Sequence, residues 1–286
     1  MKIFLYKTQL DIQKNNVFEI TDKIEDSDFI FLIFKIKSKL TQIHFVDENT
    51  IPIISEVLQL SKQYNKKIIY YCGGDRPPKI LPEYPNITIL NTSVYSSTMP
   101  KNEMVIGVPL DDTFINYIDK PKLSIGFCGT NWCGREKWLD YLSNLPEIET
   151  NFIIRDSYIT KLKSRHIKDF NSNMNSNLFI FCYRGGGNFS IRFYETLMHG
   201  RIPIVIKTDS VFPFEDIIDY NKLGIFIEED EINETKSIKD IIINYYNSKT
   251  AHELLCIQKY NRKIYLKYFH PDIYWEKIFT YIHTFN

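Results

Sequence analysis

The chain has 286 residues, of which 44% are hydrophobic and 24% are charged, so it can bury a substantial core. Its 35 basic residues balance its 35 acidic residues, which argues against a general nucleic-acid binder, since that class needs a basic excess. No apolar run approaches the roughly 20 residues of a membrane-spanning helix, and the N-terminal MKIFLYKT reads as a strand rather than a signal peptide. The odd number of cysteines, 5, fits a reducing compartment. We therefore expect a soluble, cytoplasmic protein.

Short apolar runs alternate with helical patterns along most of the chain. The more apolar runs are continuous, which is typical of strands covered by helices on both faces. Repeated strand–helix–strand units predict α/β architecture with parallel sheets of the Rossmann type. The expected strands are 2–6, 29–36, 42–46, 67–72, 87–91, 104–108, 124–128, 150–154, 177–183, 202–207 and 224–227. The expected helices are 51–64, 135–145, 190–199, 238–247, 252–268 and 270–285.

A break near residues 119–123 divides these elements into two series. Pro121 prevents a continuous helix there, and the chain length fits two domains at roughly 100–200 residues each. We expect one Rossmann-like domain over residues 1–120 and a second over residues 121–268. A separate C-terminal helix should occupy residues 269–286.

The strongest chemical signal lies in residues 177–207, NLFIFCYRGGGNFSIRFYETLMHGRIPIVIK. A strand leads into a glycine turn, and a helix begins near Ser190, whose side chain can cap it. Glycines let backbone N–H groups approach a ligand closely, and a helix start favours an anion. Ligands of open parallel sheets bind beyond the carboxyl ends of the strands, where this turn lies. We therefore expect a phosphate-bearing ligand at the turn, which consists of Arg184, Gly185, Gly186 and Gly187.

Two charged residues on the following helix strengthen this expectation. Arg192 falls in the first helical turn, where a cation opposes the helix dipole. A diphosphate at the same end would resolve the conflict, and arginine holds such a group through two parallel hydrogen bonds. Glu195, one turn further on, is placed to accept hydrogen bonds from ribose or sugar hydroxyls. The alternative is a surface Arg192–Glu195 pair beside a flexible turn, which the short pattern GGGNFS alone would favour.

Four motifs follow one another in this region: CYRG at 182–185, SIRFYE at 190–195, GRIPI at 200–204 and PFED at 213–216. Their order and spacing resemble the signature of exostosin-family glycosyltransferases, glycosyltransferase family 47. Upstream, IGFCGTNWCGREKWLD at 125–140 is similar to the strand–Gly–Arg–helix element that opens the family's second domain, with Arg135 in the arginine position. The resemblance covers residues 123–230 and is faint before residue 120.

The chain also departs from the family pattern. Tyr183 stands where the family usually has proline, and Tyr220 lies near a common tryptophan position. The short chain without a membrane anchor looks like compact viral or microbial members.

This resemblance implies the GT-B architecture, in which two Rossmann-like domains bind the acceptor and the donor, respectively. In such transferases a C-terminal helix often crosses back to the first domain. The resemblance also implies inverting transfer from a UDP-sugar, with a preference for UDP-xylose, to a hydroxyl of a glycan acceptor. The expected donor-binding residues are Arg184, Gly185, Gly186, Gly187, Ser190, Arg192, Glu195, Arg135, Glu215 and Asp216. For Glu215 and Asp216, capping of a helix over 217–220 is an equal alternative.

An inverting transfer needs a base that takes the acceptor proton. Our first candidate is Asp75, in the loop CGGDRPP after a predicted buried strand, although it could instead pair with Arg76 on the surface. Asp47, after another strand, is the second. The string Asp26-Ser27-Asp28 resembles a metal-binding pair but precedes a strand far from the donor signature, so a solvated turn is expected. We predict no essential metal or other cofactor.

Other classes compete with this interpretation. A GT-B transferase of fucosyl or heptosyl type would share the donor element but use a GDP- or ADP-sugar. A degenerate transferase domain could serve as a glycan-binding module, although the pair of Arg192 and Glu195 argues against it. A dinucleotide-dependent oxidoreductase fits poorly, since the first strand–turn, LYKTQLD, lacks the expected glycines. The oligomeric state is not predicted.

Overall fold

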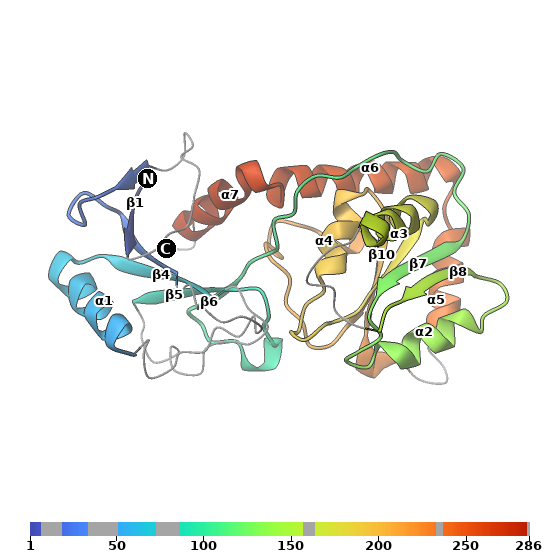
Figure 1. Cartoon of the computed structure of the whole chain (residues 1–286), viewed down its shortest axis with the longest axis horizontal. Helices are drawn as coiled ribbons and strands as arrows, with labels where there is room; N and C mark the ends of the chain where they lie inside the picture. Colours follow the sequence, from blue (N-terminus) through green and yellow to red (C-terminus); the bar gives the residue numbers. More distant parts are fainter. Residues whose placement is uncertain (7–18, 34–50, 73–85, 157–163, 233–236, 285–286) are drawn as a thin grey trace.

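The structure is a computed structural model that describes residues 1–6, 19–33, 51–72, 86–156, 164–232 and 237–284. These residues form two parallel α/β units, joined by a linker and by a C-terminal pair of helices (Figure 1). This arrangement confirms the prediction of two Rossmann-like domains with parallel sheets. The predicted domain limits at residues 120 and 268 stay predictions.

The first unit is a parallel sheet in the order β2-β1-β3-β4-β5-β6. Helix α1 (Ile51–Tyr64) buries Ile54 and Val57 against one face of this sheet. The strands are β1 (Lys2–Tyr6), β2 (Glu19–Thr21), β3 (Phe29–Ile33), β4 (Lys67–Cys72), β5 (Ile87–Asn91) and β6 (Glu103–Val105).

The second unit is a parallel sheet in the order β11-β10-β9-β7-β8. Strand β8 lies on one side of β7, and the later strands continue on the other side. The chain therefore has a topological switch point between β7 and β9, where open α/β sheets bind ligands. The strands are β7 (Ser124–Gly129), β8 (Glu149–Ile154), β9 (Phe179–Cys182), β10 (Ile202–Lys207) and β11 (Ile225–Glu228).

Helices cover both faces of the second sheet, which explains the continuous apolar strands. Side chains of α3 (Ser164–Ser176) and α4 (Ile191–Met198) share a core with Ile180 and Cys182 on one face. On the other face, α2 (Arg135–Ser143) and α5 (Ile238–Asn247) pack with Phe179 and Phe181.

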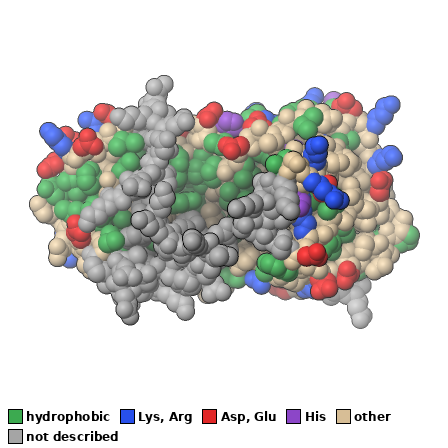
Figure 2. Space-filling view, viewed as in Figure 1, with side chains coloured by type: hydrophobic (Ala, Val, Ile, Leu, Met, Phe, Trp, Pro, Cys, Tyr) green, Lys and Arg blue, Asp and Glu red, His purple; other side chains and the backbone are tan. Residues whose placement is uncertain are grey.

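Two C-terminal helices connect the units. Helix α6 (Ala251–Tyr268) begins at a capping box formed by Thr250 and Glu253, and α7 (Pro271–Thr284) continues from it to the first unit (Figure 1). Two rings of α7 lie edge-on to the ring of Phe31 in β3. The ring centre of Trp275 is 5.5 Å from that of Phe31, and the ring centre of Phe279 is 5.4 Å from it. The prediction of a helix that crosses back to the first domain is therefore confirmed. Figure 2 shows hydrophobic side chains gathered between the two units on this face.

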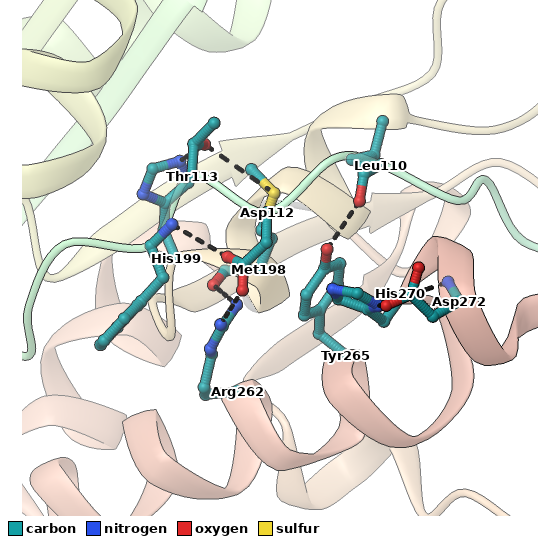
Figure 3. A network of polar contacts seen from close by, with 10 residues as sticks. Leu110, Asp112, Thr113, Met198, His199, Arg262, Tyr265, His270 and Asp272 are labelled. Carbon is teal, nitrogen blue, oxygen red and sulfur yellow. Dashed lines mark hydrogen bonds and ion pairs between the residues drawn. The ribbon is translucent and has the colours of Figure 1, made fainter.

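The linker after β6 is held along its length by side chains of α6 and α7. The hydroxyl of Tyr274 donates to the Gly107 carbonyl at 2.6 Å, and that of Tyr265 donates to the Leu110 carbonyl at 2.6 Å. The Arg262 guanidinium binds Asp112 and donates to the Met198 carbonyl at 2.8 Å (Figure 3). These bonds fix how the second unit is joined to the first.

Most predicted elements lie close to where the sequence placed them, but one helix and one strand were not predicted. Helix α3 was not predicted, because its sequence SRHIKDFNSNMNS is rich in serine and asparagine and buries only Asn173 and Met174. Strand β2 was missed because it has only 3 residues. The predicted strand 42–46 lies outside the described residues. Within the part of the chain that the structure covers, no helix is long and apolar enough to span a membrane.

Candidate functional site at the β7–β9 switch point

The glycine turn predicted from the sequence follows β9 at the switch point. The backbone N–H of Gly185 donates to the Phe189 carbonyl at 3.1 Å, which closes the turn. None of the three turn glycines has a positive φ, unlike Gly134 and Gly200. A Cβ at position 185 would lie 3.4 Å from Arg135 Nη2, an ordinary contact distance, so the turn passes close to this guanidinium.

Ser190 precedes α4 as its N-cap residue, but its side chain makes no capping hydrogen bond. The prediction of a side-chain cap is therefore wrong. The Ser190 hydroxyl oxygen is buried and has no hydrogen-bond partner among the described residues. The hydroxyl is thus available to a ligand at the helix start.

Arg135 joins the two loops that flank the switch point. Its Nη1 donates to the Thr130 carbonyl at 3.0 Å, after β7, and its Nη2 donates to the Tyr183 carbonyl at 3.2 Å, after β9. The residues just before it, Cys133 and Gly134, both have positive φ values, 62° and 86°. This tight turn starts α2 close to the sheet edge.

Arg192, in the first turn of α4, approaches the same edge. Its guanidinium carbon lies 5.2 Å from the ring centre of Phe127, and that of Arg135 lies 5.8 Å from the same ring. A Cβ on Gly129 would lie 3.0 Å from Arg192 Nη2, so glycine at the end of β7 makes room for the guanidinium. Burial, and then the charge of Arg192, lower the pKa of Arg135.

Arg192 and Glu195 form a largely buried pair. Their side chains are 13% and 20% exposed, and Arg192 Nη1 lies 3.6 Å from Glu195 Oε2, which is longer than a hydrogen bond. Burial raises the pKa of Glu195, although Arg192 and Arg155 act in the opposite direction. The pair is thus not the exposed one that the alternative interpretation required.

The site leaves several buried polar groups without hydrogen-bond partners. Among the described residues, Arg135 Nε, Arg192 Nη1 and Ser190 Oγ have none. Buried donors without partners are costly, and so are two neighbouring cations in a partly buried position. An anion bound between these groups would remove both costs.

The sequence analysis missed a further arginine at this edge. Arg155 follows β8 directly, and its backbone N–H donates to the Gly129 carbonyl at 2.8 Å. Its Nη2 donates to the His166 carbonyl at 2.8 Å. The sequence signal was its position directly after a predicted strand, but only the sheet order places that strand beside β7.

Three other predicted donor-binding residues make hydrogen bonds to groups outside this cluster of arginines. Arg184 Nη1 donates to the Tyr95 hydroxyl of the first unit at 3.1 Å. Glu215 Oε1 accepts the Phe212 backbone N–H at 2.9 Å, and Asp216 accepts the Tyr281 hydroxyl at 2.5 Å. Glu215 and Asp216 line a cavity of about 880 Å³ at the junction of the units, and no arginine is among the described residues that line it. Residues 217–219 are not helical, and a short 3₁₀ turn follows at Tyr220–Lys222, so the helix-cap alternative is wrong.

The catalytic-base candidates Asp75 and Asp47 lie outside the described residues, and their roles stay predictions. Asp26 and Asp28 are exposed on a turn before β3, and Asp28 Oδ2 accepts the Lys2 backbone N–H at 2.6 Å.

The two departures from the family pattern have structural roles. The Tyr183 hydroxyl donates to Glu229 Oε1 at 2.9 Å, and the ring stacks on Phe181. The Tyr220 hydroxyl donates to the Pro213 carbonyl at 2.6 Å. Both aromatic residues therefore support the loops around the site.

A Rossmann-like unit with a cationic, partly buried switch point is typical of domains that bind phosphate-bearing ligands. Residues 135–242 match the Exostosin GT47 domain. The four motifs of the sequence lie inside this match, which supports the family resemblance that they indicated.

Two curated relatives are similar to a shorter stretch of the chain. The "Probable glucuronosyltransferase 47 A" of Physcomitrium patens is 31% identical over 78 residues, which are 27% of this chain and 17% of that relative. The "Probable beta-1,4-xylosyltransferase IRX10L" of Arabidopsis thaliana is 28% identical over 78 residues, 27% of this chain and 19% of that relative. The matches thus span less than a fifth of either relative.

Two solved structures align over more of the chain, at lower sequence identity. The crystal structure of an alpha1,3-fucosyltransferase aligns with 99% of this chain and 89% of its own, at a TM-score of 0.44 and 12% identity. The crystal structure of TarM aligns with 74% of this chain and 54% of its own, at a TM-score of 0.43 and 11% identity. Neither similarity is high enough to transfer function.

Proposed function

We propose that this protein is an inverting glycosyltransferase that moves a sugar from a UDP-sugar to a hydroxyl of a glycan acceptor. One observation carries the proposal: Arg135 and Arg192 converge on the ring of Phe127 at the switch point, and both retain unpartnered buried N–H groups among the described residues. A diphosphate is the anion whose charge and size suit two guanidinium groups and a helix start.

In this proposal the donor diphosphate lies between the glycine turn and the start of α4. Arg192, Arg135 and the Ser190 hydroxyl would donate to its oxygens. Negative charge grows on the diphosphate as the sugar leaves, and fixed donors at that position lower the barrier. Glu195, one turn into α4, would accept a hydrogen bond from a donor hydroxyl, and its nearness to Arg192 would orient that guanidinium.

The chemical step is a single displacement. The acceptor hydroxyl oxygen forms a bond to the anomeric carbon from the face opposite the diphosphate. The bond from that carbon to the phosphate oxygen breaks, and its electron pair leaves with the diphosphate. The hydroxyl proton passes to a carboxylate of the first domain, for which Asp75 and then Asp47 are the candidates. The arginines take the role of a charge-neutralising metal, so we propose that none is required.

The donor preference is the finer part of the proposal. The two relatives are named as a probable glucuronosyltransferase and a probable beta-1,4-xylosyltransferase. These names support a UDP-linked pentose or uronic acid as donor, with UDP-xylose preferred. A GDP- or ADP-sugar donor is the alternative within transferases. A degenerate glycan-binding module is the alternative outside enzymology.

A panel of nucleotide sugars separates these possibilities. We expect UDP and UDP-xylose to raise the melting temperature, because a ligand that binds only the folded state stabilises it. Slow hydrolysis of the same UDP-sugar should be measurable without acceptor. Stabilisation by GDP- or ADP-sugars instead would change the donor class, and glycan binding without any donor hydrolysis would indicate a binding module. The cytoplasmic location is likewise proposed, and fractionation of cells that produce the protein would test it.

A further inference from the structure

Asn188, the residue after the turn glycines, is 1% exposed and makes three hydrogen bonds that leave the turn. Its backbone N–H donates to Ser93 Oγ at 2.7 Å, and its Nδ2 donates to the Val94 carbonyl at 3.0 Å. Its Oδ1 accepts the Thr208 hydroxyl at 2.5 Å. Two of these partners belong to the first domain, and the third follows β10 in the second domain.

These bonds are part of a seam between the loop after β5 and the loops after β9 and β10. Tyr95 and Ser210 form an antiparallel bridge. The Ser96 backbone N–H donates to the Asp209 carbonyl at 2.9 Å, and the Ser97 hydroxyl donates to Asp209 Oδ2 at 2.5 Å. The seam therefore places the first domain directly against the turn that precedes α4.

The glycine turn has little to hold it from within. Apart from the hydrogen bond between Gly185 and Phe189, glycines offer no side chains that could fix its path, and they are conformationally permissive. Asn188 stands between these glycines and Ser190, the N-cap of α4. The backbone and the side chain of Asn188 are both hydrogen-bonded to residues outside the turn. These bonds therefore fix the position of the turn.

We propose that Asn188 is a positioning residue for the donor: through Ser93, Val94 and Thr208, it holds the glycine turn where its backbone N–H groups meet the diphosphate. This inference rests on the proposed function. It means that the affinity for the nucleotide depends on a loop of the acceptor domain. Asn188 itself is not expected to touch the donor.

The test compares three variants by calorimetric titration with UDP and by donor kinetics. Asn188→Ala removes the bonds to Val94 and Thr208, and Ser93→Ala removes the acceptor of the Asn188 backbone N–H. Asn261→Ala is the matched control, because Asn261 is also fully buried and donates to two carbonyls, those of Arg201 and Leu223. Those carbonyls belong to the start of β10 and the approach to β11, at the opposite edge of the same sheet from the turn.

We expect Asn188→Ala to raise the Kd for UDP and the donor KM about tenfold, since it removes two hydrogen bonds of the turn. Its kcat should stay within about twofold of wild type, because the arginines remain in place. Ser93→Ala should raise the same constants by a smaller factor of about three, which keeps the test valid if Asn188→Ala does not fold. Asn261→Ala should lower the melting temperature without changing the Kd for UDP.

Three results would overturn the inference, and each has a different meaning. If wild type binds UDP while folded Asn188→Ala and Ser93→Ala bind it equally well, the positioning role is wrong and the proposed function stands. If wild type binds none of UDP, GDP and ADP, the proposed function is wrong and the inference falls with it. Equal losses of affinity in Asn261→Ala would show a general effect of stability and would also contradict the positioning role.

Discussion

Arg135 Nη2 lies 3.2 Å from the carbonyl oxygen of Tyr183, and through this hydrogen bond the start of α2 holds the loop that follows β9. The same guanidinium is bonded to Thr130 in the loop that follows β7. The two loops on either side of the switch point are thus one connected structure. Any ligand bound there would contact both, which is why several predictions concern this residue and its neighbour Arg192.

Replacement of Arg192 by alanine should abolish donor turnover while the protein stays folded. We expect kcat/KM for the donor to fall by about 100-fold or more, the usual cost of removing one donor to a developing anion. Arg165→Ala is the control, because its side chain on α3 is 89% exposed. Wild-type turnover in Arg192→Ala, measured with the best donor of the panel, would refute the assignment of this arginine.

Arg135→Lys keeps the charge but loses the planar fork that binds two carbonyls. The free energy of unfolding should fall by about 1–3 kcal/mol, because one buried carbonyl loses its partner. The donor KM should rise as well, since the loops after β7 and β9 are no longer joined. Urea denaturation and donor kinetics would measure both effects, with the exposed Lys137→Ala as a control. Unchanged values in both measurements would contradict the joining role.

His199 makes stability depend on pH. Its side chain is fully buried and makes a hydrogen bond with the Thr113 hydroxyl (Figure 3). Burial, and then the charges of Arg201 and Arg262, lower the pKa of His199 to about 4. The charge of Asp112 acts in the opposite direction. In the unfolded chain, His199 becomes protonated below the ordinary histidine pKa of 6.5, whereas in the folded protein it stays neutral until a lower pH. Stability present above pH 6.5 should decline as the pH falls towards 4, by about 3 kcal/mol in all.

The test is the free energy of urea unfolding between pH 7 and pH 4 in wild type and His199→Gln. The variant should lack this part of the decline, whereas His283→Gln, at an exposed position in α7, should keep it. Parallel curves for wild type and His199→Gln would show that another group causes the decline.

The proposed base predicts a selective loss of transfer. Asp75→Asn should lower kcat for transfer by about 100-fold or more, the usual contribution of general base catalysis, while the Kd for UDP stays unchanged. Asp47→Asn is the second candidate and is measured in parallel, with the exposed Asp26→Asn as a control. Full transfer activity in both candidate variants would remove both from the mechanism.

The sequence predicted the elements whose signal is local. Strands β4 and β10 were expected at their observed limits, because each is a continuous apolar run. The glycine turn and the start of α4 were also predicted, since both depend on neighbouring residues. Helix α3 was missed because its apolar face is too small to be seen among its serine and asparagine residues.

Features that depend on the order of the strands in the sheet could not be predicted from the sequence. Arg155 lies beside Gly129 only because β8 pairs with β7. Asn188 bonds to residues more than ninety positions earlier, and no local pattern indicates such partners. Ser190 occupies the N-cap position that its sequence context predicts, but its hydroxyl accepts no hydrogen bond from a backbone N–H of α4.

The proposed independence from a metal ion is tested with a chelator. Because two arginines are proposed to neutralise the leaving diphosphate, transfer should proceed unchanged after extensive treatment with EDTA. Activity that is lost with EDTA and restored by manganese would mean that a divalent ion supplies part of that charge.

The most direct measurement is an experimental structure of the protein with UDP bound. We predict that the diphosphate lies within hydrogen-bonding distance of Arg192 and of the first backbone N–H groups of α4, with Arg135 on its other side. A diphosphate bound anywhere else, or a switch point closed by packed side chains, would contradict the central claim.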